Sequence, residues 1–379
     1  MILRLEIRDT HKIPRPGEPQ PLLTVTVNLK ERSYPIHLGA GLLNQVGELA
    51  RTNGIKGKVG IVTNPVVAGL YLDQVETSLT QSGYETVAFV VPDGEEHKNF
   101  TSLNNLYDQL IEHRFDRSST LMALGGGVIG DLTGFAAATF LRGINFIQLP
   151  TTLLAQVDAS VGGKTAVNHQ RGKNLIGAFY QPRMVVIDVQ TLETLSTREY
   201  VAGISEVIKY GVIEDANFFV YLEDHLDQLL HLEPDVVERV IATSCRIKAM
   251  VVEQDEREND RRAILNFGHT LGHALESFTN YERFLHGEGV AIGMVQAAIL
   301  SAQEGLCTTT DLSRLERLVR AAGLPWQIPR DIGVEQLLGG LEVDKKSLAG
   351  KIKFVLCSGI GATQFQWLTP QEILHRLAP

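Results

Sequence analysis

The sequence predicts two domains, an α/β domain with a largely parallel sheet followed by a mainly α-helical domain. Three observations support this. The chain has 379 residues, more than one hydrophobic core usually serves. Between residues 58 and 188, short apolar runs alternate with segments of helical period, which is typical of a parallel sheet whose ligands bind beyond the strands' carboxyl ends. After about residue 190 the helical period dominates.

The elements of the first half follow from local composition. Residues 1–21 are rich in proline, which favours a flexible leader. Two alternating runs, 23–29 and 34–38, predict an opening β-hairpin. Further strands are expected at 58–63, 85–91, 120–124, 145–149 and 184–188, with helices at 69–82 and 100–113 and another after the glycines near residue 126.

The second half reads as a helical domain that ends in a small hairpin. Helices are expected at 196–211, 216–230, 234–252, 267–279, 287–304 and 312–322, and the hairpin pairs 351–357 with 363–367. The boundary between the α/β pattern and the helical pattern lies between Asp188 and Thr197. The predicted division is therefore a leader at 1–21, an α/β domain at 22–190 and a helical domain at 191–379.

Composition narrows the classes of function. A net charge of −9 argues against a general nucleic-acid or acidic-membrane surface. Cys245, Cys307 and Cys357 have no metal-binding or redox spacing, so we expect reduced cysteines in an intracellular protein. The sequence contains no apolar run of membrane-spanning length, and its first residues do not resemble a signal peptide, so a cytoplasmic location is expected.

A glycine cluster predicts a nucleotide site. Residues 125–130 fit the pattern G-x-G-x-x-G between a strand and a helix, where glycines let a pyrophosphate approach the helix N-terminus. The usual acidic residue downstream is missing, and such turns also occur for packing alone. Asp93, Glu95 and Glu96 are candidates for binding ribose hydroxyls, and their alternative interpretation is a solvated turn.

Residues 158–165 end in Gly-Lys-Thr like a phosphate-binding P-loop, but Asp158 stands where the first glycine is needed. An ATPase is therefore a poor interpretation. Lys164, placed in a predicted glycine-rich loop, is better suited to contact an anion.

Three histidines suggest a metal or phosphoryl site. His269 and His273 share one helix face at i and i+4, and His286 follows soon after. An isolated pair of this kind is often two histidines that pack or face solvent and bind no ligand. Glu206 would complete, with His269 and His286, a set of three ligands that leaves an open position, as in catalytic zinc sites. The alternative for Glu206 is an exposed helical pair with Lys209.

Several cations stand out in this acidic protein because they lie in glycine-rich or apolar settings. Taken singly, each is more often a solvated surface residue. Together they indicate an anion-binding pocket, and with one amide they are Arg142, Lys164, Lys173, Asn174, Lys209, Lys248 and Arg262.

Residues 125–135, 150–165, 172–177, 205–211 and 266–276 together closely resemble the 3-dehydroquinate synthase family, and the resemblance extends from about residue 24 to the C-terminus. It implies a Rossmann-like NAD-binding domain and a lyase of the shikimate pathway that uses NAD and Zn²⁺ (or Co²⁺). The implied reaction converts 3-deoxy-D-arabino-heptulosonate 7-phosphate to 3-dehydroquinate and phosphate. It proceeds by transient oxidation with NAD, phosphate elimination, re-reduction and intramolecular aldol closure.

The resemblance also implies roles for individual residues. The metal ligands would be Glu206, His269 and His286. Cofactor contacts would be Glu95, Lys98, Gly126, Gly127, Asp131, Thr151, Thr152, Lys173 and Thr194. Substrate contacts would be Arg142, Asp158, Lys164, Asn174, Lys209, Lys248, Arg262, Asn266 and His273, with either Lys345 or Lys346. Arg142 would act across a homodimer, and His273 would bond to phosphate or water without ligating the metal.

Three alternatives remain open. Another sugar phosphate cyclase, of the 2-deoxy-scyllo-inosose or 2-epi-5-epi-valiolone synthase type, would act on a substrate without a carboxylate, whereas Lys248, Arg262 and Asn266 favour an acid. An NAD- and metal-dependent polyol dehydrogenase would release NADH. A non-catalytic nucleotide or metal sensor would leave the cationic pocket unexplained.

Overall fold

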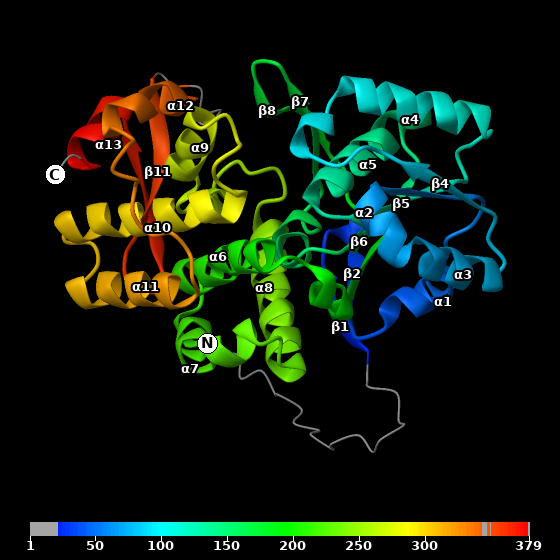
Figure 1. The fold of residues 1–379 in the computed structure, drawn as a ribbon, viewed down its shortest axis with the longest axis horizontal. Coiled ribbons are helices and arrows are strands. Elements are labelled where there is room, and N and C mark those ends of the chain that lie inside the picture. The colour runs from blue at the N-terminus through cyan, green and yellow to red at the C-terminus, as the bar shows by residue number, and fades with distance from the viewer. Residues whose placement is uncertain (1–21, 343–346, 349, 378–379) are drawn as a thin grey trace.

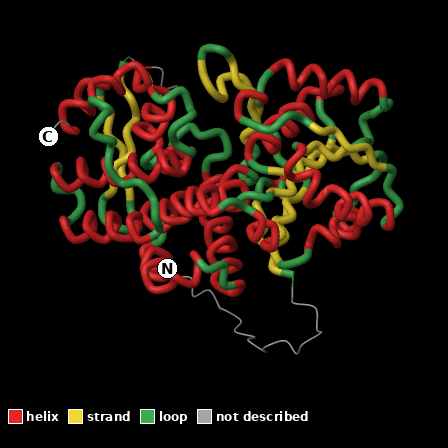
Figure 2. Tube along the Cα trace, in the orientation of Figure 1, coloured by secondary structure: helices red, strands yellow, loops and turns green. Residues whose placement is uncertain are grey.

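The computed structural model describes residues 22–342, 347–348 and 350–377, and Figure 1 shows their arrangement. An α/β part and a mainly helical part lie side by side, and helices α6 (Thr197–Ile213) and α8 (Pro234–Gln254) lie between them (Figures 1 and 2). The predicted leader at 1–21 and the pair Lys345 and Lys346 lie outside the described residues.

A seven-stranded sheet forms the centre of the α/β part, in the order β1-β2-β9-β6-β5-β3-β4. Its strands are β1 (Leu23–Val27), β2 (Tyr34–Gly39), β3 (Val59–Thr63), β4 (Thr86–Val90), β5 (Thr120–Gly125), β6 (Asn145–Pro150) and β9 (Met184–Asp188). Every neighbouring pair from β2 to β4 is parallel, and β1 adds an antiparallel edge through the predicted hairpin with β2. The predicted fold class is confirmed.

Helices cover both faces of the sheet, which explains its nearly continuous apolar strands. Along β5, Leu121 and Ala123 pack into one core cluster, and Met122 and Leu124 pack into another on the opposite face. The covering helices are α4 (Phe100–Glu112) and α5 (Gly127–Thr139) on the first face, and α1 (Val46–Thr52) and α3 (Asp73–Gln81) on the second.

The helical part packs around α6 and α10. Its helices are α6 (Thr197–Ile213), α7 (Ala216–Leu230), α8 (Pro234–Gln254), α9 (His269–Phe278), α10 (His286–Gln303), α11 (Thr309–Ala321), α12 (Leu338–Glu342) and α13 (Pro370–Leu377). Side-chain caps set two of the starts, Ser196 before α6 and Asp215 before α7. The predicted hairpin is present as β11 (Lys351–Cys357) and β12 (Thr363–Leu368), and the short β10 (Ser347–Leu348) pairs with β11.

The structure corrects two local predictions. The helix expected at 69–82 begins earlier, as α2 (Pro65–Val67), because Asn64 caps it and proline suits a first turn; a π-helical turn at Ala68–Leu72 then leads into α3. The glycine-rich loop expected around Lys164 was wrong. Lys164 instead begins β7 (Lys164–His169), which pairs with β8 (Gly172–Phe179) because Val167 and Ile176 pack against the core beside α5.

The hairpin β7–β8 projects between the two parts of the molecule (Figure 1). Among the helices of the described residues, none combines the length and the apolar character needed to cross a membrane.

Candidate active site

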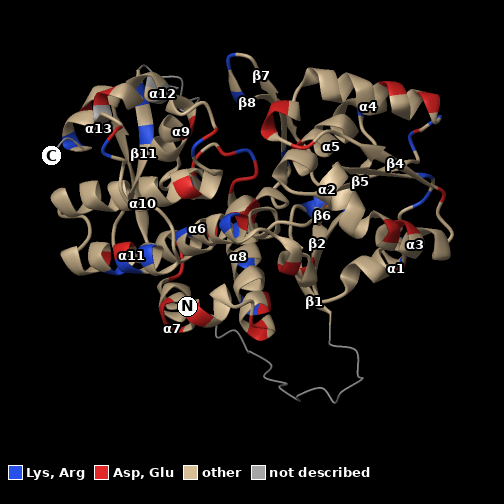
Figure 3. Cartoon of the chain, viewed as in Figure 1, with Lys and Arg blue, Asp and Glu red and all other residues tan. Residues whose placement is uncertain are grey.

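A cavity of about 470 Å³ lies between the α/β part and helices α6, α8, α9 and α10. Most of the predicted substrate and cofactor residues line it: Glu95, Lys98, Gly127, Asp131, Asp158, Lys164, Lys173, Asn174, Lys209, Lys248, Arg262, Asn266 and His273, with His269 and His286. Figure 3 shows basic and acidic positions together where α6 and α8 lie close, and further basic positions on the β7–β8 hairpin. The cavity is therefore lined by many basic side chains, although the protein as a whole has a net negative charge.

The glycine turn after β5 forms one wall of the cavity. Gly126 precedes α5 and no side chain among the described residues caps this helix, so its first amides remain available to an anion. A Cβ on Gly126 would lie 3.2 Å from Cγ2 of Thr152, which shows how closely the turn packs against the segment after β6. These features fit the pyrophosphate of a dinucleotide such as NAD.

A buried lysine stands beside this turn. Nζ of Lys98, which is 4% exposed, lies 2.7 Å from Oδ2 of Asp131 and 3.9 Å from Oε1 of Glu95. Burial opposes its charge, but the two carboxylates outweigh burial and raise the pKa of Lys98. Lys173 approaches the same Glu95 carboxylate at 3.8 Å. Glu95 therefore belongs to the cavity wall, whereas Asp93 and Glu96 do not line it.

Two of the candidate metal ligands, His269 and His286, line the cavity, and the third, Glu206, lies buried behind them. Glu206 on α6 is fully buried and ion-paired to Lys209. Its Oε1 lies 3.6 Å from Nε2 of His269 and 3.9 Å from Nε2 of His286, and it accepts no hydrogen bond among the described residues. A buried carboxylate facing two imidazoles fits a divalent metal such as Zn²⁺ or Co²⁺.

His273 lies close to the same point. One ring nitrogen from each of His269, His273 and His286 can be chosen so that all three lie within 4.8 Å of one another. The geometry thus offers a second possible ligand set, with His273 in place of Glu206. The two sets differ in burial, since Glu206 is fully buried and His273 is exposed.

Buried cations also line the cavity. Nζ of Lys248 lies 2.6 Å from Oδ1 of Asp158. Burial lowers the pKa of Lys248 to about 8, against the opposing effect of this carboxylate. Burial also opposes the charge on Asp158, but Lys248 and Lys209 hold the pKa of that carboxyl well below its usual range. Arg262 is 1% exposed and donates to the carbonyls of Gly162 and Glu256.

Some predicted residues do not line the cavity. Gly126 is part of the glycine turn, Thr151 and Thr152 pack directly against that turn, and the Thr194 hydroxyl bonds to the Tyr71 hydroxyl. Arg142 is exposed and follows Leu141 in a turn where both have positive φ, 70° and 50°. Arg142 therefore does not reach the cavity of its own chain.

Several residues that line the cavity or contact its lining were not predicted from the sequence as site residues. Glu276, Ser277 and Tyr281 line it, and Nζ of Lys173 lies 3.9 Å from the centre of the Tyr281 ring. Glu258 pairs with Lys164 and accepts from Nδ2 of Asn266 at 2.7 Å. One signal in the sequence could have identified Glu276, which follows His269 and His273 by seven and three residues on the same predicted helix.

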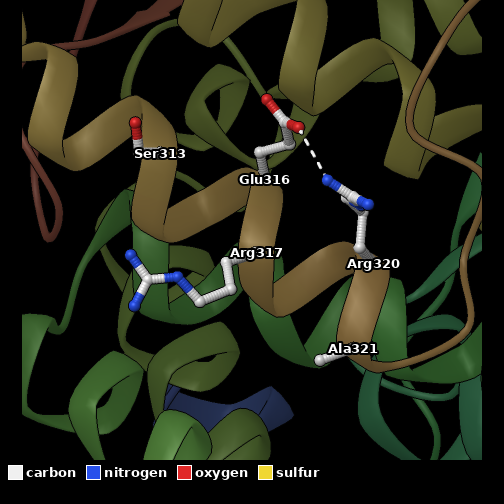
Figure 4. Close-up of a pocket in the computed structure, with 5 residues that line it drawn as sticks. All are labelled: Ser313, Glu316, Arg317, Arg320 and Ala321. Atoms are coloured by element: carbon white, nitrogen blue, oxygen red, sulfur yellow. Dashed lines mark hydrogen bonds and ion pairs between the residues drawn. The ribbon is translucent and has the colours of Figure 1, made fainter.

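A second hollow, of about 610 Å³, lies on α11 and is lined by Ser313, Glu316, Arg317, Arg320 and Ala321 (Figure 4). Arg320 and Glu316 pair with each other there at 3.5 Å. Of the predicted site residues that the structure describes, none lines this hollow.

Two family models match adjoining segments of the chain. The 3-dehydroquinate synthase N-terminal model matches residues 88–202, and the 3-dehydroquinate synthase C-terminal model matches residues 203–347. Among curated proteins, a 3-dehydroquinate synthase from Pelobacter propionicus is 53% identical over 350 residues, which cover 92% of this chain and 97% of that protein.

Solved structures of related enzymes have the same architecture. A 2-deoxy-scyllo-inosose synthase, complexed with carbaglucose-6-phosphate, NAD⁺ and Co²⁺, has a TM-score of 0.86 at 26% identity and covers 94% of this chain and 99% of its own. A 2-epi-5-epi-valiolone synthase from Streptomyces hygroscopicus, with NAD⁺ and Zn²⁺ bound, has a TM-score of 0.84 at 27% identity and covers 92% and 97%.

Proposed function

The chain belongs to the 3-dehydroquinate synthase family, and we propose that the cavity between its two parts is the active site. The enzyme is a carbon–oxygen lyase acting on phosphates, which converts 3-deoxy-D-arabino-heptulosonate 7-phosphate to 3-dehydroquinate and phosphate in the shikimate pathway. The single observation that carries the assignment of the site is the convergence on one cavity of buried cations, the glycine turn and the histidines that face the buried Glu206.

NAD and a divalent metal, when bound, supply reversible hydride acceptance and Lewis-acid polarisation of the substrate's oxygens. The residues that would hold the metal are Glu206, His269 and His286. The residues that would hold NAD are Glu95, Lys98, Gly126, Gly127, Asp131, Thr151, Thr152, Lys173 and Thr194. The glycine turn at the α5 N-terminus and the Lys98–Asp131 pair on the same cavity support this assignment.

The remaining polar side chains bind and orient the substrate, which carries a phosphate and a carboxylate. Lys248, Arg262 and Asn266 would bind the acid, because their cationic and amide donors converge in a partly desolvated pocket where such contacts are strong. Asp158 would hold Lys248 and Lys209 in place. Lys164, Asn174 and Lys209 would bind hydroxyl or phosphate oxygens, and His273 would donate a hydrogen bond to the phosphate.

The competing functions have less support. The curated relative at 53% identity is named a 3-dehydroquinate synthase, whereas the two other cyclases are 26% and 27% identical. A polyol dehydrogenase does not need so many cations around its substrate. A non-catalytic nucleotide or metal sensor would not explain why these cations line the cavity.

We further propose a homodimer in which Arg142 enters the partner's cavity, a cytoplasmic location, and a domain boundary near residue 190. Arg142 is exposed and does not line the cavity of its own chain, which supports the first point. The boundary is supported by the end of β9 at Asp188 and the start of α6 at Thr197.

One experiment tests the function directly. The purified protein is given the heptulosonate phosphate with NAD and Zn²⁺, and phosphate, dehydroquinate and absorbance at the nicotinamide band are followed together. We expect equal amounts of the two products without lasting accumulation of NADH. Accumulation of one NADH per substrate would instead support a dehydrogenase, and absence of phosphate release would exclude the lyase.

A further inference from the structure

Glu276 makes a buried contact with one of the candidate metal ligands. Its side chain is 4% exposed, and its Oε1 lies 2.9 Å from Nδ1 of His286. A carboxylate at this depth is costly unless it is paired and hydrogen-bonded. The contact to His286 is therefore part of how this carboxylate is accommodated.

The packing of α9 against α10 makes this contact possible. A Cβ on Gly272 would lie 2.9 Å from the carbonyl carbon of Gly289, so the two helices touch through glycine backbone. A Cβ on Gly289 would also lie 3.3 Å from Oε1 of Glu276. Because the helices approach this closely, Glu276 reaches the N-terminus of α10, where a negative charge is favourable and where His286 is the first residue.

The contact determines which nitrogen of His286 faces the metal position. A neutral imidazole carries one proton, and donation from Nδ1 to Glu276 leaves the lone pair on Nε2. That nitrogen lies 3.9 Å from Oε1 of Glu206. His269 is arranged similarly, since its Nδ1 lies 3.2 Å from the carbonyl oxygen of Phe267 and its Nε2 faces Glu206.

We propose that Glu276 is a positioning residue that fixes the tautomer and ring orientation of His286, so that Nε2 is presented to a divalent metal. Carboxylate partners of this kind make a histidine a better ligand as well as a better oriented one. The inference rests on the proposed metal site. It concerns a residue outside the ligand set and predicts a graded effect on metal affinity.

The test measures metal binding without substrate. Metal-free protein is titrated with Zn²⁺ against a chromophoric chelator, and with Co²⁺ while its visible absorption is recorded. Glu276→Ala should weaken zinc affinity by about 10- to 100-fold and alter the Co²⁺ spectrum. Glu276→Gln, which keeps an acceptor but loses the charge, should show a smaller loss. If the alanine variant does not fold, Glu276→Gln alone still tests the inference.

Two further variants make the result interpretable. Glu282→Gln removes an exposed carboxylate a few residues away and should bind metal like the unmodified protein. Glu206→Gln tests the metal site itself. If Glu206→Gln loses metal while both Glu276 variants keep full affinity and the normal Co²⁺ spectrum, the positioning role is wrong. If Glu206→Gln also keeps metal, the proposed ligand set is wrong and the inference falls with it.

Discussion

Lys248 on α8 donates from Nζ to both the side chain and the backbone carbonyl of Asp158, each at 2.6 Å. Asp158 lies in the π-helical turn that follows β6, and its Oδ1 also accepts from the Tyr210 hydroxyl at 2.7 Å. The ion pair therefore ties the helical part to the α/β part inside the cavity wall. Its cation is also a proposed substrate ligand, so its protonation matters for catalysis.

The first prediction concerns pH. Lys248 has a pKa of about 8, below the ordinary lysine value because of its burial, and its ammonium is present below that pH. As pH rises through about 8 the cation is lost and substrate binding weakens, so kcat/KM should fall on the alkaline side. The profile is measured from about pH 6 to pH 10. Lys248→Arg keeps its charge over this range, so its alkaline limb should move to higher pH. An unmoved limb would assign the titration to another group.

The second prediction distinguishes the two possible ligand sets. Glu206→Gln removes the buried negative charge that faces both histidines, and most of the bound metal should be lost. Metal content after gel filtration is the measurement, with Glu199→Gln, an exposed change on the same helix, as the control. Retention of a full equivalent with unchanged activity would count decisively against Glu206 as a ligand.

His273→Ala should behave in the opposite way. We expect the variant to keep its zinc and to lose about 100-fold or more in kcat, because a hydrogen bond or proton transfer to the departing phosphate is removed. Metal content and kcat are measured on the same preparation. Loss of zinc from this variant would instead place His273 among the ligands, as its distance from His269 and His286 allows.

Replacing one glycine on α10 should reduce the stability of the protein. A Cβ on Gly287 would lie 1.9 Å from the carbonyl oxygen of Ala202, so Gly287→Ala must push α10 away from α6. We expect a cost of about 1–3 kcal/mol, seen as a lower Tm, and weaker metal binding because His286 moves with the helix. Gly339→Ala in α12 is the matched control, since its Cβ would meet no atom of the described residues within 4 Å. An equal effect of both substitutions would contradict a specific clash.

The proposed role of Arg142 can be tested by complementation. Arg142→Ala and Lys209→Met each disable a site, and each homodimer should have little activity. After the two are unfolded and refolded together, half of the dimers are mixed and each contains one intact site, so about a quarter of the activity should return. If each Arg142 serves its own chain, no activity will return on mixing.

The strands and most helices could be predicted because their signals are local. The apolar run of β5 and the periods of α7 and α8 agree with the structure to within about two residues. The β7–β8 hairpin was missed because its residues 172–177 are mostly polar or glycine, and its pairing depends on contacts with α5. Tertiary packing outweighed local composition there.

The site could be predicted only in part. Motif resemblance identified Lys98 and Arg262, but their burial, 4% and 1% exposed, follows from tertiary packing that composition does not reveal. The contact of Glu276 with His286 depends on the crossing of two helices at Gly272 and Gly289. Glu276 and His286 lie on different helices, so no periodic spacing in the sequence indicates that they touch.

The position of β9 between β2 and β6 has a consequence for how the chain reaches its native state. Strand β2 pairs with β9, and the backbone amide of Leu43 donates to Asp188 across 145 residues of sequence. The opening hairpin therefore has no neighbour in the sheet until nearly half the chain has been synthesised. Closing so long a loop is entropically slow. During that delay the hairpin exposes an unpaired strand edge, at which nascent or refolding chains can associate with one another.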